Sequence, residues 1–197
     1  SEQRDYVNLI GRSANVLLTL INDVLDYSQT DRWKSYDIVE FDLRKCVEEV
    51  FEICTLKGQA KNLEMVTMYD TRIPFNIVLL GDVVRVSHIL FNLICNAIKF
   101  TNEGTVMLKT MLDHFEILEN SQYMFIKFEV HDTGVGIEEI NFSKLGTPFL
   151  QLNPHNSEGT GLGLAICKSL IAEMKGSLNL ASVVGKGSVF SVVLPFQ

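Results

Sequence analysis

Apolar side chains recur at steps of three and four residues over residues 7–27, the spacing that places them on one face of a helix. The stripe consists of Val7, Ile10, Ala14, Leu17, Leu18, Ile21, Val24 and Leu25. It ends at the polar stretch 28–31, and a linker over residues 31–35 follows. We therefore predict one long, one-sided helix and a domain boundary, with residues 1–31 as one unit and residues 36–197 as another.

The second unit mixes helical and strand patterns. We predict helices over residues 43–60 and 82–99, the second capped by Asp82, and an apolar helix that opens at the glycines of residues 159–163. Strands are predicted over residues 36–41, 63–69, 105–112, 124–131, 177–182 and 188–194, with the polar stretch 113–122 as a connection and a turn at residues 185–187. Residues 138–159 have little regular period, which predicts a loop. Because helices and strands do not alternate strictly, we expect one sheet covered on one face by helices.

Composition removes several classes of function. The 17 Lys and Arg stand against 24 Asp and Glu, a net charge of −7, and the basic residues are scattered, which excludes nucleic acid as an expected partner. The four cysteines are widely spaced without a Cys-x-x-Cys pair, which favours reduced, buried thiols over a disulfide or a zinc site. No uncharged apolar run is long enough for a membrane span and no signal peptide is apparent, so we expect any membrane anchor to lie outside this chain.

Three short clusters carry candidate chemistry. The first places Asn92, Asn96 and Lys99 at positions i, i+4 and i+7 of one helix face. Amide oxygens are hard ligands that suit magnesium, and an ammonium group suits phosphate oxygens. The alternative is an ordinary solvated helix face, although Asn is a poor residue for a helix interior.

The second cluster runs from Asp132 to Ile137, where a strand leads into an Asp and the glycines Gly134 and Gly136. Glycine permits close approach of the backbone, and a carboxylate at a strand end can accept a hydrogen bond from an exocyclic amine such as that of adenine. Taken by itself, the same pattern also fits a simple turn.

In the third cluster, glycines open an apolar helix, whose free N–H groups and dipole favour phosphate. Its residues are Gly159, Thr160, Gly161, Leu162 and Gly163. No Gly-Lys-Ser/Thr follows and no strand immediately precedes the cluster, so it is neither a Walker loop nor a good dinucleotide fingerprint. A flexible hinge before a helix is the alternative.

In this order, and with the Gly-x-Gly-Ser turn at residues 185–188, the clusters resemble the N box and glycine boxes of histidine protein kinases, a branch of the superfamily that also contains gyrase, heat-shock chaperone and mismatch-repair ATPases. The motifs Asn-Ala-Ile-Lys-Phe-Thr and Gly-Thr-Gly-Leu-Gly-Leu-Ala-Ile are similar to the kinase branch, and residues 17–28 resemble the second helix of the kinase dimerisation hairpin. The resemblance implies a two-layer α/β sandwich, with a mixed, mainly antiparallel sheet covered by helices on one face and one long stalk helix before it.

The resemblance also implies roles. Asn96, helped by Asn92, would hold magnesium, Lys99 would meet a phosphate and Phe100 would lie near the base. Asp132 would bind adenine, Gly134 and Gly136 would make room for base and ribose, and Ile137 belongs to the same box. Residues 159–163 would wrap the phosphates. Residues 142–158, with Phe149 in a segment similar to the family's F box, would form a lid over ATP.

No histidine here has the context of the family's phosphate acceptor, which is followed by an acidic residue and, after two more positions, by Thr-Pro or a close variant. His131 is followed by Asp132, but Thr-Gly comes next and the histidine ends a predicted strand. We therefore expect a fragment of a longer kinase that binds ATP or ADP with magnesium in the cytoplasm and phosphorylates a histidine elsewhere. The implied partners are a response-regulator receiver domain and a second copy bound through the stalk hairpin. Acidic Glu158 stands where some kinases carry Arg or Lys, which leaves a catalytically weak regulatory module as the alternative, unless Lys144 substitutes. A gyrase-type ATPase is disfavoured, because residues 85–99 contain no carboxylate base.

Overall fold

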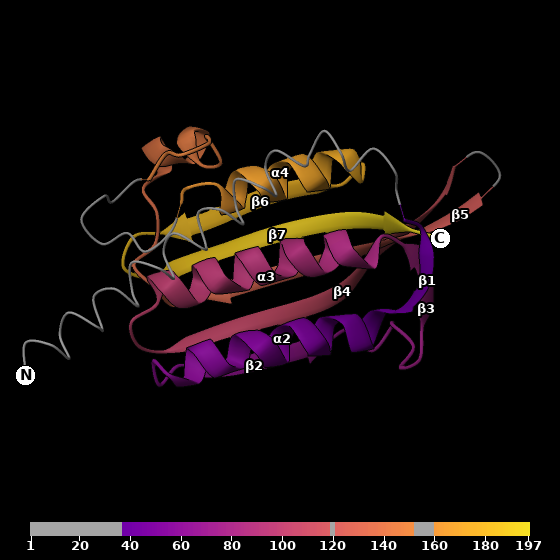
Figure 1. Ribbon diagram of the computed structural model, residues 1–197, viewed down its shortest axis with the longest axis horizontal. Coiled ribbons are helices and arrows are strands. Elements are labelled where there is room, and N and C mark those ends of the chain that lie inside the picture. Colours follow the sequence, from indigo (N-terminus) through magenta and orange to yellow (C-terminus); the bar gives the residue numbers. More distant parts are fainter. Residues whose placement is uncertain (1–36, 119–120, 152–159) are drawn as a thin grey trace, which may run out of the picture.

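The computed structural model describes residues 37–118, 121–151 and 160–197. The predicted helix within residues 1–31, the end of the predicted loop and Gly159 lie outside the described residues. Figure 1 shows the described part as one sheet with helices packed against it.

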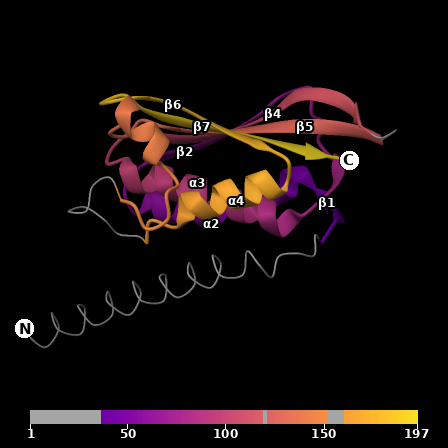
Figure 2. The same cartoon turned by 90° about the horizontal axis from the view of Figure 1, so that it is seen from above.

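The main sheet has five strands in the order β2-β4-β5-β7-β6, of which β2 and β4 pair parallel and the other neighbours pair antiparallel. Its strands are β2 (Glu64–Tyr69), β4 (Thr105–Leu118), β5 (Ser121–Asp132), β7 (Gly187–Phe196) and β6 (Ser177–Val183). The helices are α2 (Leu43–Gln59), α3 (Val83–Phe100) and α4 (Gly163–Glu173), and Figure 2 shows all three on the same face of the sheet. The predicted two-layer α/β arrangement with a mixed, mainly antiparallel sheet is confirmed.

Alternation along the strands explains why only one face is covered. In β5, Ile126, Phe128 and Val130 are fully buried, whereas Lys127 and Glu129 between them are partly exposed. A strand with period two presents its apolar side chains to one face, and the three helices bury that face. The hydrophobic core therefore lies between the sheet and the helices, and no helix of the described part covers the opposite face of the sheet.

Helix α3 is the central helix of the layer. Asp82 caps its first turn, accepting a hydrogen bond from the Arg85 backbone N–H at 3.1 Å. The buried Arg85 guanidinium also contacts the Asp82 carboxylate at 3.0 Å and Glu173 of α4 at 2.9 Å, which ties the two helices together. By length and mean hydropathy (1.3) α3 could cross a membrane, but here its apolar side is packed in the domain core.

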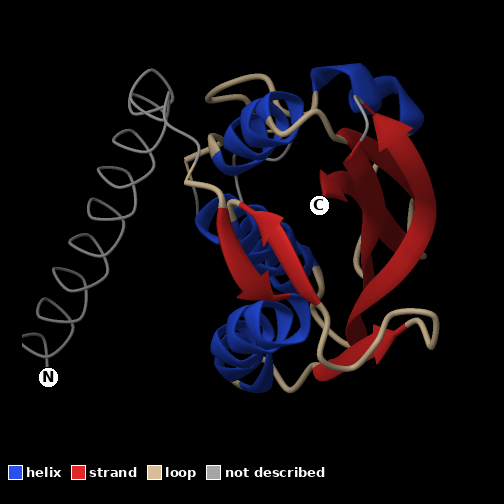
Figure 3. Ribbon diagram, turned by 90° about the vertical axis from the view of Figure 1, so that its right-hand side faces the viewer, coloured by secondary structure: helices blue, strands red, loops and turns tan. Residues whose placement is uncertain are grey.

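A separate two-stranded antiparallel ribbon, β1 (Val39–Asp42) with β3 (Val78–Gly81), leads into the first turns of α2 and α3. Figure 3 shows it as a pair of strands in front of the helices. Strand β3 was not predicted, because it has only four residues and a single buried apolar side chain, Leu79, which is too short a pattern to recognise. Phe41 and Leu79 are the buried cross-strand pair that attaches the ribbon to the core.

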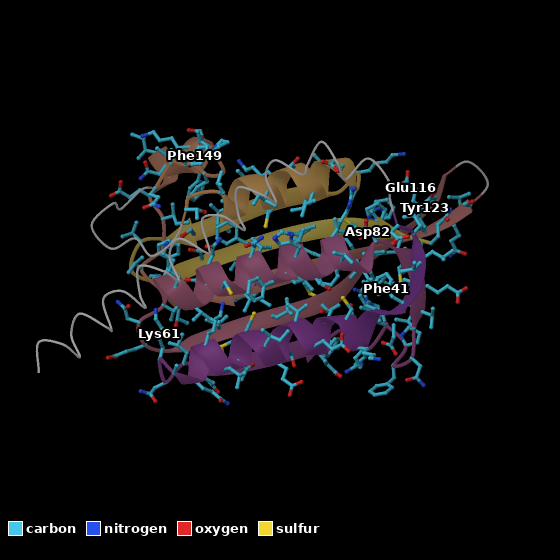
Figure 4. The ribbon with its side chains drawn as sticks, in the orientation of Figure 1. Phe41, Lys61, Asp82, Glu116, Tyr123 and Phe149 are labelled. Atoms are coloured by element: carbon cyan, nitrogen blue, oxygen red, sulfur yellow. The ribbon has the colours of Figure 1, made fainter. Side chains whose placement is uncertain are left out.

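Strands β4 and β5 continue well beyond the predicted ends, so the prediction of a connection over residues 113–122 is wrong for its described part. The strands pair as far as Leu118 with Ser121, beyond the reach of their neighbours, and form an arm (Figure 1). Glu116 and Tyr123 face each other on this arm (Figure 4). Phe115 and Ile117 alternate with polar residues on this arm but are both exposed, so pairing between the strands, and not burial, extends them. The short 3-10 helix η1 (Glu139–Lys144) was likewise predicted as loop.

Candidate functional site

The predicted polar face of α3 exists. Asn92, Asn96 and Lys99 are all half-buried, while the opposite side of the helix is formed by fully buried apolar residues. Lys99 extends over the neighbouring ring of Phe100, with Nζ 5.0 Å from the ring centroid. The spacing therefore produces one continuous polar strip along the helix.

The beginning of α4 lies against this strip. A Cβ placed on Gly163 would lie 3.3 Å from Oδ1 of Asn92, so the amide oxygen points at the helix start. The Asn92 Nδ2 atom is buried and has no hydrogen-bond partner among the described residues. The Cys167 thiol lies near the amide group. This orientation leaves the amide oxygen, a hard donor suited to magnesium, on the side of the glycine cluster at the start of α4.

Asp132 sits at the end of β5 and is almost fully buried. Its Oδ1 accepts hydrogen bonds from the backbone N–H groups of Gly134 at 2.9 Å and Ser188 at 3.2 Å. Burial raises the pKa of the Asp132 carboxyl, while these donors oppose the rise. Ser188 belongs to the turn noticed in the sequence, but its role in orienting Asp132 follows from strand pairing, which places the two residues opposite each other.

Both glycines after Asp132 are packed against the protein's own backbone. A Cβ on Gly134 would lie 2.3 Å from the Phe100 carbonyl oxygen, and one on Gly136 would lie 2.2 Å from that of Val183. A hydrogen bond holds the backbone of Ile137 in this loop, because its N–H donates to Ser182 Oγ at 2.8 Å. The structure thus already explains why glycine is needed at both positions, and room for a base or ribose stays a prediction.

The third cluster meets the predicted lid. Gly161 has a φ of +77°, and a Cβ on it would lie 2.9 Å from the backbone of Phe149, whose side chain is 63% exposed (Figure 4). Thr160 is buried, and its Oγ1 accepts a hydrogen bond from the Leu162 N–H at 3.1 Å. Leu162 is fully buried in the hydrophobic core, so its side chain serves packing and can offer a ligand at most its backbone.

Helix α3 brings the clusters together. The loop after Asp132 joins its C-terminal end, where Val135 N–H donates to the Phe100 carbonyl at 3.2 Å, and the glycines of α4 join at Asn92. Phe100 comes eight residues after Asn92, which is roughly 12 Å along the helix axis. Lys144, by contrast, lies on η1 with Nζ 3.5 Å from Asn141 Oδ1.

Sequence reasoning missed Lys61, which follows α2 (Figure 4). Its ammonium donates to the carbonyl oxygens of Ile98 at 2.9 Å and Lys99 at 3.0 Å, and so caps the C-terminal end of α3 beside the candidate site. A lysine so far from α3 in the chain carries no local signal of this contact.

Comparisons with known proteins agree with this geometry. The family profile "Histidine kinase-, DNA gyrase B-, and HSP90-like ATPase" matches residues 81–197, more than half of the chain. Hybrid signal transduction histidine kinase B of Dictyostelium discoideum is 36% identical over 99% of this chain and 10% of its own length. Signal transduction histidine-protein kinase BarA of Escherichia coli (strain K12) is 38% identical over 95% of this chain and 20% of its own length.

The crystal structure of full-length ShkA in complex with AMPPNP superimposes with a TM-score of 0.78 and 28% identity, covering 100% of this chain and 39% of that one. The chain spans between 9% and 21% of the first curated relatives that it matches. The resemblance read from the N box and the glycine boxes is therefore confirmed. This chain belongs to the family of histidine kinase-, DNA gyrase B- and HSP90-like ATPases, and it contains the ATP-binding catalytic domain of a histidine kinase.

Proposed function

We propose that this domain binds ATP with magnesium along α3 and passes the terminal phosphate to a histidine outside this chain. The observation that carries the proposal is the placement of the clusters at two ends of one polar strip. Gly163 adjoins Asn92 at one end, and the loop after Asp132 adjoins Phe100 at the other. An elongated ligand with a base at one end and phosphates at the other suits such a strip.

The adenine end is assigned to Asp132. Two backbone N–H groups hold one carboxylate oxygen and thereby fix the orientation of the side chain. A fixed, largely buried carboxylate is a selective acceptor for an exocyclic amine, because an unpaired acceptor there is costly for any base that lacks the amine. The proposed base and ribose site is completed by four neighbouring residues: Phe100, Gly134, Gly136 and Ile137.

The phosphate end is assigned to the start of α4 and the middle of α3. The first N–H groups of an α-helix have no partner within the helix, and Gly161 and Gly163 keep side chains away from them. Thr160, Leu162 and Gly159 belong to the same proposed phosphate loop, with Phe149 as part of the lid. Lys99 lies toward the base end of the strip, beside Phe100, and its long side chain is the proposed cation for the phosphate oxygens.

Magnesium fits the donors present. The residues that the structure describes contain no group of three or more His, Cys, Asp and Glu that could hold a metal ion. Asn92 and Asn96 instead offer amide oxygens, and magnesium keeps most of its waters and binds the phosphates of its nucleotide. When bound, the ion would neutralise charge on the transferring phosphoryl group. The role of the two side chains is to position that charge beside Lys99.

Transfer breaks the bond between the terminal phosphorus and the oxygen of the departing ADP, and forms a bond to an imidazole nitrogen. Two histidines of this domain are engaged on the sheet: His131 contacts Glu129 at 2.9 Å, and His114 stacks on Phe125. Because none of the four histidines has the sequence context of the family's acceptor, we assign the acceptor to another part of the intact protein. The name "hybrid" kinase carried by a relative supports a receiver domain as partner, and four free thiols support a reducing cytoplasm. Dimerisation through the stalk hairpin rests on the sequence resemblance.

Calorimetry of ATP and ADP binding in the presence of magnesium tests the site. We expect Asn96→Ala and Asp132→Ala each to weaken binding about tenfold or more, some 1.4 kcal/mol. Asn179→Ala is the matched control, because this exposed asparagine lies on the open face of the sheet. Failure of the parent chain to bind either nucleotide would contradict the proposal.

Phosphotransfer needs a second assay, with a hairpin that carries an acceptor histidine supplied to the chain. Formation of acid-labile phosphohistidine from ATP supports the kinase activity. Nucleotide binding without phosphohistidine would favour the alternative, a regulatory module whose lid responds to nucleotide without chemistry.

A further inference from the structure

Helices α2 and α3 lie side by side and run in the same direction (Figures 1 and 2). Near their beginnings, Cys46 Sγ lies 3.5 Å from Ser87 Oγ. At their ends, Lys61 contacts the carbonyl oxygen of Ile98 at 2.9 Å. Residues about forty positions apart in the chain therefore face each other along the whole length of the helix pair.

The same register brings together two cysteines. Cys54 and Cys95 each lie eight residues after Cys46 and Ser87, about two helical turns further along. Lys57, one helical turn after Cys54 on α2, has its Nζ 3.7 Å from Cys95 Sγ, so the Cys95 thiol lies against the part of α2 that carries Cys54. Facing positions on two packed helices can meet the short Cα and Cβ separations that a disulfide needs.

The two sulfurs differ in access. Cys54 is fully buried, whereas Cys95 is only half-buried. The other two cysteines lack such a partner: Cys46 faces a serine, and fully buried Cys167 lies near the Asn92 amide. Of the four cysteines, which all lie in the described part of the chain, this pair alone is placed for cross-linking.

We propose that Cys54 and Cys95 are a modification site, a dithiol that peroxide converts reversibly into a disulfide between α2 and α3. The Cys95 sulfur attacks the peroxide O–O bond, forming a sulfenic acid and releasing water. The Cys54 sulfur then attacks the Cys95 sulfur, and the S–O bond breaks as hydroxide leaves with the Cys54 proton as a second water. Hydrogen peroxide takes the two electrons, and a dithiol reductant returns them.

The disulfide would act on the nucleotide site, a consequence that rests on the proposed function. Cys95 directly precedes Asn96 and follows Asn92 by three residues on α3. An S–S bond is about 2.0 Å long, so oxidation draws the two sulfurs together from non-bonded contact and shifts α3 relative to α2. Displacements of about 1 Å are enough to weaken a positioned binding group. Oxidation therefore lowers the affinity for magnesium nucleotide.

The first experiment treats the reduced, folded chain with hydrogen peroxide, alkylates the remaining thiols and maps peptides by mass spectrometry. We expect a Cys54–Cys95 cross-link, loss of two of the four thiols and recovery with dithiothreitol. Cys46→Ser should keep the cross-link, and Cys54→Ser should abolish it; if the latter does not fold, Cys95→Ser at the half-exposed position makes the same test. Peroxide-treated protein in which Cys54 stays unlinked would overturn the proposal.

A gain-of-function variant tests the helix register on which the assignment depends. Ser87→Cys places a thiol opposite Cys46, so oxidation should produce a second disulfide between α2 and α3. Its absence, in a folded variant, would show that facing positions are not close enough to cross-link and would contradict the geometric argument.

The second experiment measures binding of AMPPNP with magnesium to reduced and oxidised chain by calorimetry. We expect at least fivefold weaker binding after oxidation, restored by dithiothreitol, and no effect of peroxide on Cys95→Ser. A cross-linked chain with unchanged affinity would overturn the regulatory consequence. Absence of binding by the reduced chain would instead contradict the proposed function and leave the cross-linking result intact.

Discussion

Replacement of Arg85 by methionine tests how α3 is held in place. The Arg85 side chain is 2% exposed and joins two carboxylates, Asp82 at 3.0 Å and Glu173 of α4 at 2.9 Å. Methionine fills a similar elongated space without charge. The Arg85→Met variant therefore removes the cation and leaves both carboxylates without this partner.

The expected decrease in the free energy of unfolding depends on how deeply the two carboxylates are buried. Removing one partner of a buried ion pair typically costs about 3 to 5 kcal/mol, because the remaining charge is left uncompensated. Asp82 is 7% exposed and carries this penalty, whereas Glu173 is 32% exposed and can regain water. Asp82 also keeps the backbone hydrogen bond that caps α3. We therefore expect a loss of about 3 kcal/mol, at the low end of that range.

Urea unfolding followed by circular dichroism gives the free energy of unfolding of parent and variant. Lys45→Met is the control, because Lys45 contacts Glu49 at 4.0 Å on the surface with both side chains well exposed, and such pairs contribute about 0 to 1 kcal/mol. The double variant with Asp82→Asn should recover part of the loss, since the buried charge is gone. If Arg85→Met lowers the free energy of unfolding by less than about 1 kcal/mol, with an unchanged slope against urea concentration, the reasoning is refuted.

Two further predictions concern the loop after Asp132. Gly136→Ala should lower the free energy of unfolding by roughly 1 to 3 kcal/mol more than Gly185→Ala: both glycines have positive φ, but the new Cβ meets the Val183 carbonyl at 2.2 Å in the first and nothing within 4 Å in the second. Equal losses in urea unfolding would contradict the packing argument. Burial raises the pKa of Asp132 above its ordinary 3.8, so the native state binds the extra proton, and stability falls as pH rises from 3.8 through the raised value. Asp132→Asn should therefore be at least as stable as the parent at pH 7 yet bind ATP about tenfold more weakly; lower stability with unchanged affinity would make Asp132 a structural residue.

Strong local patterns predicted the elements that lie in the core. The helix over residues 82–99 was placed within one residue of α3, because a capping Asp and a one-sided apolar stripe mark both its start and its buried face. Patterns failed where an element gains its stability from elsewhere. The β4–β5 arm and strand β3 have few buried positions of their own, and strand pairing decides their extent.

Some features of the candidate site could likewise be predicted from local sequence, and others could not. The spacing of Asn92, Asn96 and Lys99 already specified a polar strip, since helix geometry depends on neighbours in the chain. By contrast, only strand pairing places Ser188 against the Asp132 carboxylate, and only helix packing places Lys61 at the end of α3. The structure also gives a reason for glycine at positions 134 and 136, because both residues are packed against carbonyl oxygens of the protein itself.

The sequence by itself determined the kind of chemistry, because amides, a strand-end carboxylate and glycines before a helix have properties that do not depend on the rest of the fold. It also determined the period of each core element, which follows from neighbouring residues alone. Only the tertiary structure decided which of these groups share a site, which glycines are required for packing and which two cysteines face each other. Those relations join residues tens of positions apart, and burial of the common core brings them together.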